Sequence, residues 1–168
     1  MRAALLAVLL CSAPVLAREG LEPVSRPARW GIGFMLGEPF GLSLKRYLGG
    51  VNAWDVYVSP GDGPGIRFGG DWLWNLGRAE HGRQFDIDIY AGVGPTIGSF
   101  QGGWCGPGFY GSRCGNGNLY LGGRVPVGAE LLLREAPFSF GVEVAPGIAF
   151  APDGFLLFDF LFAVRYLF

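Results

Sequence analysis

The sequence predicts an all-β chain in which eight antiparallel strands close into an up-and-down barrel. Apolar and polar residues alternate with a period of two along eight successive segments, and short turn sequences separate most of them. No segment after Arg29 has the periodicity of a helix. The chain has 168 residues, the length of one domain, and its 13 basic residues do not exceed the 14 acidic ones. It therefore lacks the basic surplus that binds nucleic acid, and no nucleic-acid partner is expected.

The first residues predict an export signal rather than a part of the barrel. Arg2 supplies a positive charge, residues 3–10 form an uninterrupted apolar stretch, and Ala17 completes a pattern suited to cleavage. We therefore expect a secretory signal peptide over residues 1–17, an N-terminal segment over 18–28, and the barrel over 29–168. Cys11 raises the alternative of a lipoprotein signal, which the bulky Leu10 in front of it disfavours.

Four short alternating segments predict the first half of the barrel. Apolar residues such as Trp30, Ile32 and Phe34 occupy every second position, with glycine or polar residues between them. Gly, Pro and Asp are frequent in the sequences that follow, and these residues favour turns. Strands are expected over residues 30–36, 42–45, 54–59 and 66–75, and turns over 37–40, 48–50, 60–64 and 77–84.

The second half of the barrel is predicted from four longer segments. Strands are expected over residues 85–93, 119–133, 138–148 and 156–168, with turns at 134–137 and 151–154 and one long connector at 96–118.

Since the strands of the first hairpin are shorter than the 9–11 residues usual for a membrane-spanning strand, the rim of the barrel is expected to be uneven.

Two prolines fall inside the sixth and seventh of these segments. If Leu133 pairs with Phe138 across the turn at 134–137, then Val125 lies opposite Pro146, and Pro126 adjoins that pair. Two missing N–H donors so close together should interrupt or bulge the ladder there, and we expect a bulge within about two residues of Pro126.

The two faces of the strands differ in a way that predicts which one looks inward. One face carries nearly every tryptophan and most phenylalanines, whereas the other carries many glycines and most strand charges. The lumen of eight strands is just wide enough for side chains to fill, so it suits glycines beside a few large residues. We therefore expect the aromatic face to contact lipid, as in a transmembrane β-barrel, with a soluble carrier barrel as the alternative. Arg46 shares the apolar face, near a strand end where it can snorkel. The charges expected inside are Lys45, Asp55, Arg67, Asp71, Asp86, Asp88, Arg124, Glu130, Glu143, Asp159 and Arg165.

Charges in so narrow a lumen are expected to pair and to hydrogen-bond with one another. The alternative is a cation path or a metal site that uses Asp71, Asp86 and Asp88. A lumen filled by side chains disfavours an open pore. No cofactor is expected. No catalytic residue is expected either, because the only histidine, His81, lies in a predicted turn with no serine beside it.

The connector at 96–118 carries the remaining candidate features. Cys105 and Cys114 are expected to form a disulfide in an oxidising compartment, with two free thiols as the alternative. Aromatic residues on a constrained loop can anchor a binding partner, or they can fold over the barrel mouth and cap it. The candidate contacts for an extracellular ligand are Phe100, Trp104, Phe109 and Tyr110.

The last segment resembles the terminal strand of the small Gram-negative outer-membrane β-barrels of the OmpA/OmpX type. It ends at Phe168 and has apolar residues at every second position back to Phe158. The resemblance is architectural, and it implies a monomer in the outer membrane, with membrane lipid around it and the barrel-assembly machinery as a partner during insertion. The residues that would carry the assembly signal are Phe160, Phe162, Val164, Tyr166 and Phe168.

The resemblance also implies an orientation. In this class both termini and the short turns lie in the periplasm, and the longer loops are extracellular. The segment 18–28 and the turns at 77–84 and 134–137 would then be periplasmic, and the connector at 96–118 would lie outside. The function expected is a non-catalytic integral outer-membrane protein with a structural or surface-interaction role. The alternative is a narrow channel for ions or small solutes through the charged lumen.

Overall fold

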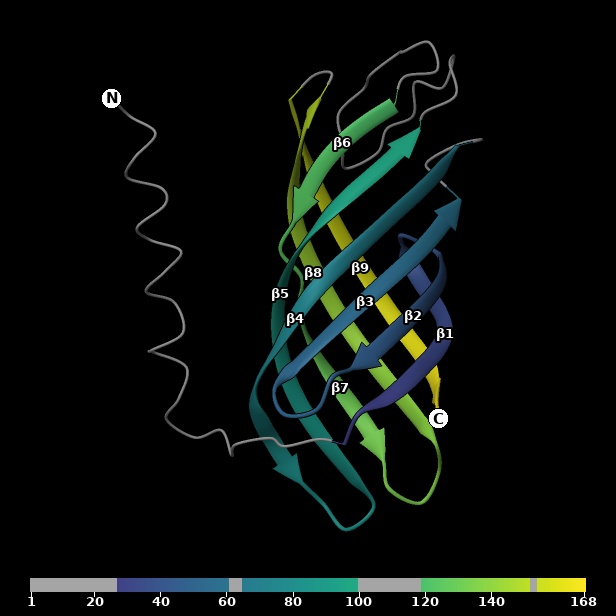
Figure 1. The fold of residues 1–168 in the computed structure, drawn as a ribbon, viewed down its shortest axis with the longest axis vertical. Helices are drawn as coiled ribbons and strands as arrows, with labels where there is room; N and C mark the ends of the chain where they lie inside the picture. Colours follow the sequence, from purple (N-terminus) through teal and green to yellow (C-terminus); the bar gives the residue numbers. More distant parts are fainter. Residues whose placement is uncertain (1–26, 61–64, 100–118, 152–153) are drawn as a thin grey trace, which may run out of the picture.

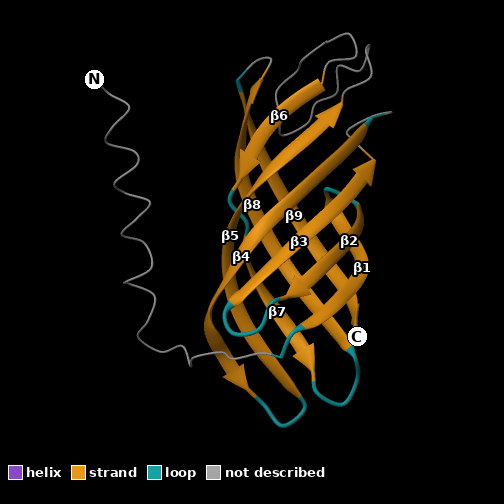
Figure 2. Ribbon diagram, viewed as in Figure 1, coloured by secondary structure: helices purple, strands orange, loops and turns teal. Residues whose placement is uncertain are grey.

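The computed structural model describes residues 27–60, 65–99, 119–151 and 154–168, and these residues form a closed antiparallel β-barrel (Figures 1 and 2). Strands that follow one another in the sequence pair, except that β6 and β7 each pair with β5 and β8, and β1 pairs with β9 to close the ring. The strands are β1 (Arg29–Glu38), β2 (Gly41–Tyr47), β3 (Asn52–Pro60), β4 (Ile66–His81), β5 (Phe85–Ser99), β6 (Leu119–Arg124), β7 (Val127–Leu133), β8 (Phe138–Ala151) and β9 (Phe155–Leu167). Within these described ranges, no helix is long and apolar enough to cross a membrane.

β6 and β7 are two parts of one interrupted strand, so the barrel is built from eight strands, as the sequence predicts. Both parts lie between β5 and β8, and their pairing with β8 keeps one register, from Arg124 opposite Gly147 to Val127 opposite Val144. Only the two residues between them, Val125 and Pro126, fall outside the assigned ladder.

The two prolines explain this interruption. The Val125 N–H donates to the Pro146 carbonyl at 2.9 Å, and the Gly92 N–H donates to the Pro126 carbonyl at 2.8 Å. Each proline thus accepts a ladder bond but has no N–H to return one. The expected interruption is confirmed, whereas the expected bulge is wrong, because a missing donor removes a bond without inserting a residue. The nearest register shift lies at Leu121–Gly122.

Two boundaries differ from the sequence prediction. The turn expected over 77–84 is strand as far as His81, and the start of the expected connector, 96–99, belongs to β5. Register shifts between Asn75 and Gly77 and between Arg78 and Glu80 explain the first difference, because they break the period of two on which the prediction depends. The β4–β5 hairpin is therefore longer than predicted.

The barrel is shorter on one side, which confirms the uneven rim expected from the sequence. β2 has 7 residues and β3 has 9, whereas β4 has 16 and β5 has 15 (Figure 1). The chain enters β1 and leaves β9 at the end of the barrel where the β4–β5 and β7–β8 hairpins lie, which we call the base (Figure 1).

Inward tyrosines account for three of the glycines on the inner face. Three of them lie directly opposite a glycine of the neighbouring strand, and their rings cover that glycine. A Cβ atom at the glycine would lie 2.2 to 2.6 Å from the nearest atom of the ring, so no larger residue fits without moving the ring. The pairs are Tyr57 with Gly69, Tyr90 with Gly128, and Tyr120 with Gly98.

Candidate functional site

A network of charged side chains fills the interior of the barrel. Ten of the eleven charges predicted to point inward are at most 5% exposed, which confirms the assignment of the two faces for them. Their positions alternate with small apolar clusters along the barrel axis. The ten are Lys45, Asp55, Arg67, Asp71, Asp88, Arg124, Glu130, Glu143, Asp159 and Arg165.

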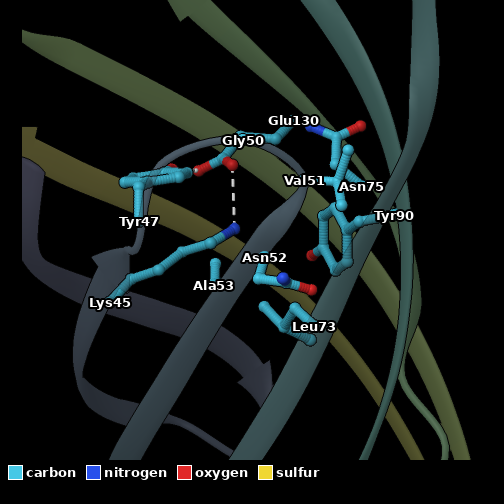
Figure 3. Close-up of a pocket in the computed structure, with 10 residues that line it drawn as sticks. All are labelled: Lys45, Tyr47, Gly50, Val51, Asn52, Ala53, Leu73, Asn75, Tyr90 and Glu130. Atoms are coloured by element: carbon cyan, nitrogen blue, oxygen red, sulfur yellow. Dashed lines mark hydrogen bonds and ion pairs between the residues drawn. The ribbon is translucent and has the colours of Figure 1, made fainter. Parts of the chain in front are cut away.

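Lys45 and Glu130 form an ion pair in the half of the lumen toward the base (Figure 3). Lys45 Nζ lies 2.8 Å from Glu130 Oε2, and the Tyr47 hydroxyl donates to Glu130 Oε1 at 2.6 Å. The ammonium also lies 4.5 Å from the centre of the Tyr90 ring and 5.1 Å from that of Tyr47. These rings and the carboxylate replace the water that a buried ammonium loses.

Arg165 connects this pair to the next group along the lumen. Its Nε donates to the Ser43 hydroxyl at 2.9 Å, and its Nη2 donates to Asp55 Oδ2. Ser43 donates in turn to Asp55 Oδ1 at 2.7 Å, and Arg165 Nη1 lies 3.7 Å from Glu130 Oε1. Both Asp55 oxygens are therefore bonded, as the burial of a carboxylate requires.

Asp159 joins two arginines in the half of the barrel away from the base. Arg67 donates from Nη1 to Asp159 Oδ1 at 2.9 Å and from Nη2 to Oδ2, a bidentate pair. Arg124 Nη1 donates to the same Oδ2 at 3.0 Å. Arg124 also binds Asp71 through Nε and Nη2, and its Nη2 lies 3.2 Å from Glu143 Oε1.

These interactions cross the lumen rather than run along one strand. Arg67 on β4 and Asp159 on β9 lie on opposite sides of the eight-stranded barrel. Lys45 on β2 and Glu130 on β7 also lie on opposite sides. A small cavity of about 20 Å³ lies beside Lys45, Asn75 and Glu130 near the base, with room for about one water molecule (Figure 3). The described interior is thus occupied by paired side chains.

The alternative metal or cation site is not assembled. Asp71 is bonded to Arg124, and Asp88 accepts hydrogen bonds from Asn75 at 2.9 Å and from Arg78 at 3.1 Å. Asp86 lies at the rim, where Arg78 contacts both it and Asp88, and in the described part of the chain no three potential ligands gather around one point.

Asp86 corrects the sequence prediction, because it belongs to the rim at the base instead of the buried network. Its side chain is 15% exposed and accepts a hydrogen bond from Arg134 Nη2 at 2.8 Å. Arg78 Nη2 lies 3.7 Å and His81 Nδ1 lies 3.0 Å from its oxygens. The neighbouring outward residues Glu80 and His81 are polar and exposed, so this end of the hairpin extends beyond the apolar outer face. Partial burial tends to raise the pKa of Asp86, but the Arg134 hydrogen bond and the charges of Arg78 and Arg134 outweigh it and lower that pKa.

The outer face of the barrel is apolar. Along β9, Phe158, Phe160, Phe162 and Tyr166 are exposed, whereas the residues that alternate with them are buried, namely Asp159, Leu161, Ala163, Arg165 and Leu167. The same alternation occurs on the other strands and includes Ile32, Phe34, Leu42, Val56, Phe68, Trp72, Val93, Val127, Val142 and Ile148. Four of the five assembly-signal residues, Phe160, Phe162, Tyr166 and Phe168, are among the exposed side chains.

Sequence reasoning missed the neutral partners of the buried charges. Ser43, Tyr47, Tyr90 and Thr96 hydrogen-bond to network residues, and Tyr57 lies 4.4 Å from the Arg124 guanidinium. A signal was available for Ser43, Tyr57 and Tyr90, because they occupy inward positions of predicted strands, whereas Tyr47 and Thr96 lie beyond the predicted strand ends.

Several predicted features lie outside the described residues. They are the signal peptide at 1–17, Cys105 and Cys114, and the loop contacts Phe100, Trp104, Phe109 and Tyr110.

Comparison with known proteins adds no identification, since no family model, curated protein or solved structure matches this chain.

Proposed function

We propose that this chain is an integral outer-membrane protein whose barrel has a structural or surface-interaction role and is filled by its own side chains. One observation carries the proposal: a continuous apolar outer face surrounds a charged interior. A barrel in water has the opposite arrangement, because it buries apolar side chains and exposes charged ones.

The size of the apolar face fits a bilayer. The 13 residues of β9 extend about 40 Å along the strand at about 3.3 Å per residue, and a tilt of about 40° reduces this to a height of about 30 Å. The apolar band of an outer-membrane barrel is about 25 Å tall. β9 is therefore long enough to cross that band.

Aromatic residues lie toward both ends of the apolar face. Near the base, Trp30 and Trp54 pack edge to face at 5.3 Å, and Phe138 packs on Tyr166 at 5.6 Å. Toward the other end Phe68, Phe150 and Phe158 are exposed. Aromatic girdles at the two interfaces are typical of barrels in membranes.

The interior supports this proposal over a soluble carrier. A carrier of a small ligand needs a cavity of several hundred Å³, typically lined by apolar groups. The cavity beside Lys45 has a volume of about 20 Å³, and among the described residues ion pairs and small apolar clusters occupy the lumen around it. The same filling supports a barrel without a wide aqueous path, and single-channel recording in planar bilayers tests that point against the channel alternative.

Membrane fractionation followed by electrophoresis in SDS of unheated and boiled samples tests the proposal. We expect the protein in the outer-membrane fraction and a faster band in the unheated sample, because a closed barrel stays compact in SDS until it is heated. A protein recovered from the soluble periplasmic fraction would contradict the proposal.

The surface-interaction role depends on the connector at 96–118, of which residues 100–118 lie outside the described part. Replacing Trp104 and Tyr110 with alanine is expected to lower attachment of intact cells to a surface, while replacing the exposed Glu80 at the opposite end with alanine leaves attachment unchanged. Equal attachment of cells with the wild-type protein, the loop variant and the Glu80 variant would show that the loop does not mediate attachment.

A further inference from the structure

Arg46 occupies an unusual place on the outer face of the barrel. It lies on β2 directly between Trp30 on β1 and Trp54 on β3, so the three residues form one row across three neighbouring strands. Its neighbours in the sequence, Lys45 and Tyr47, point into the lumen, so Arg46 points away from the interior charges. The row Trp30–Arg46–Trp54 belongs to the aromatic girdle near the base.

Among the residues that the structure describes, no carboxylate pairs with the charge of Arg46. Each of the three interior arginines binds at least one buried Asp or Glu, whereas Arg46 makes no ion pair with any described residue. Its contact is with the face of the Trp30 ring, whose centre lies 4.6 Å from the guanidinium carbon. A cation–π contact of this kind orients the guanidinium but leaves its charge uncompensated.

The row also carries unused hydrogen-bond donors. A guanidinium has five N–H donors and an indole has one, and neither group accepts hydrogen bonds. Among the residues that the structure describes, none accepts a side-chain hydrogen bond from Arg46, Trp30 or Trp54. A ligand that satisfies all three must be an acceptor, and the arginine charge requires it to be an anion.

The height of the row identifies the source of that anion. Trp30 is the second residue of β1 and Arg46 is the last but one of β2, so both lie near the base. In the proposed orientation this end faces the periplasm, and a flexible arginine stem reaches from the apolar face to the headgroup layer there.

We propose that Trp30, Arg46 and Trp54 bind the phosphate of an anionic phospholipid in the periplasmic leaflet. In this site the guanidinium pairs with the phosphate oxygens, and the indole rings pack beside the glycerol backbone and donate to its ester oxygens. The inference rests on the proposed membrane location, and it adds a lipid headgroup preference that the fold alone does not require.

Quenching of tryptophan fluorescence by brominated lipids tests this site, because two of the five tryptophans of the chain belong to it. The protein is reconstituted in vesicles that mix brominated phosphatidylglycerol with unbrominated phosphatidylcholine, or brominated phosphatidylcholine with unbrominated phosphatidylglycerol, and the relative affinity follows from the quenching curves. We expect a preference of about fivefold for phosphatidylglycerol, the factor expected for one arginine near an anionic surface.

Variants separate the site from general charge effects. Arg46→Gln should abolish the preference, Arg46→Lys should retain most of it, and Arg83→Gln is the matched control. Arg83 is an exposed arginine beyond the end of β4, where its loss should leave the preference unchanged.

The outcomes distinguish this inference from the proposed function. A wild-type protein that inserts, shows the heat-dependent mobility shift and is quenched equally by both lipids overturns the lipid site alone, whatever the variants do. An equal loss of preference in Arg46→Gln and Arg83→Gln overturns it as well. A wild-type protein that neither inserts nor is quenched overturns the proposed membrane location.

Discussion

Arg67 and Asp159 face each other across the full width of the barrel, from β4 on one side to β9 on the other, and are joined by two hydrogen bonds. Asp159 has no exposed surface and also accepts from Arg124 at 3.0 Å. One carboxylate therefore holds two arginines in the half of the barrel away from the base.

Removal of this carboxylate should destabilise the barrel strongly. Asp159→Ala leaves two buried guanidinium groups without their shared partner, and breaking a buried pair in this way costs about 3–5 kcal/mol. Urea unfolding of the protein reconstituted in vesicles measures the change in free energy. Glu80→Gln, at an exposed end of β4, is the control and should change stability by less than about 0.5 kcal/mol. Equal stability of the two variants would show that the network does not hold the strands together.

The glycine opposite Tyr57 should be intolerant of a single methyl group. A Cβ at Gly69 would lie 2.2 Å from the Tyr57 ring, and that ring packs against the Arg124 guanidinium at 4.4 Å, so it has little room to move. We expect Gly69→Ala to lower the free energy of unfolding by about 1–3 kcal/mol.

Gly123→Ala is the matched control for this substitution, because the nearest atom to its added Cβ lies at 3.8 Å. It should have little effect beyond the small stabilising change in chain entropy, below about 1 kcal/mol. If both alanine variants unfold at the same urea concentration, the tyrosine–glycine pairs do not explain the glycine content of the inner face.

The rim at the base should lose stability in acid through Asp86. Its pKa is lower in the folded protein than the value of about 3.9 in an unfolded chain, so its contribution is present above that value. The contribution disappears as the pH falls through the folded pKa. We expect Asp86→Asn to be less stable than wild type at pH 7, by less than about 1 kcal/mol for a partly exposed pair, and this difference to be smaller at pH 3. Urea midpoints at both pH values measure this difference, and a gap that persists unchanged in acid would exclude the ionised carboxylate as its cause.

The sequence predicted the barrel well where the period of two is unbroken. The inward positions of Lys45 and Asp159 follow from that period alone, because a strand turns alternate side chains to opposite faces. The period fails at the register shifts near Asn75 and Arg78, so the extension of the β4–β5 hairpin could not be predicted from it. Without that extension, Asp86 was predicted to be one of the buried charges.

The choice of partners in the lumen could not be predicted from the sequence. Lys45 and Glu130 are 85 positions apart and lie on opposite sides of the ring. Their contact depends on the tilt of the strands and the stagger of the ladder around the whole barrel, which the pattern of one strand does not contain. The same limit applies to Arg46 and Trp30, whose proximity depends on the register of β1 with β2.

Arginine substitutions at two depths on the outer face test whether lipid surrounds the barrel. Val144 lies in the middle of β8, six positions from Phe138 and six from Phe150, whereas Leu156 lies at the end of β9 away from the base and is 74% exposed. If lipid surrounds the barrel, Val144→Arg should destabilise the protein folded in vesicles by about 2–4 kcal/mol, and Leu156→Arg should destabilise it by about 0–1 kcal/mol. Equal, small effects at both positions would mean that water covers this face, and would contradict the account.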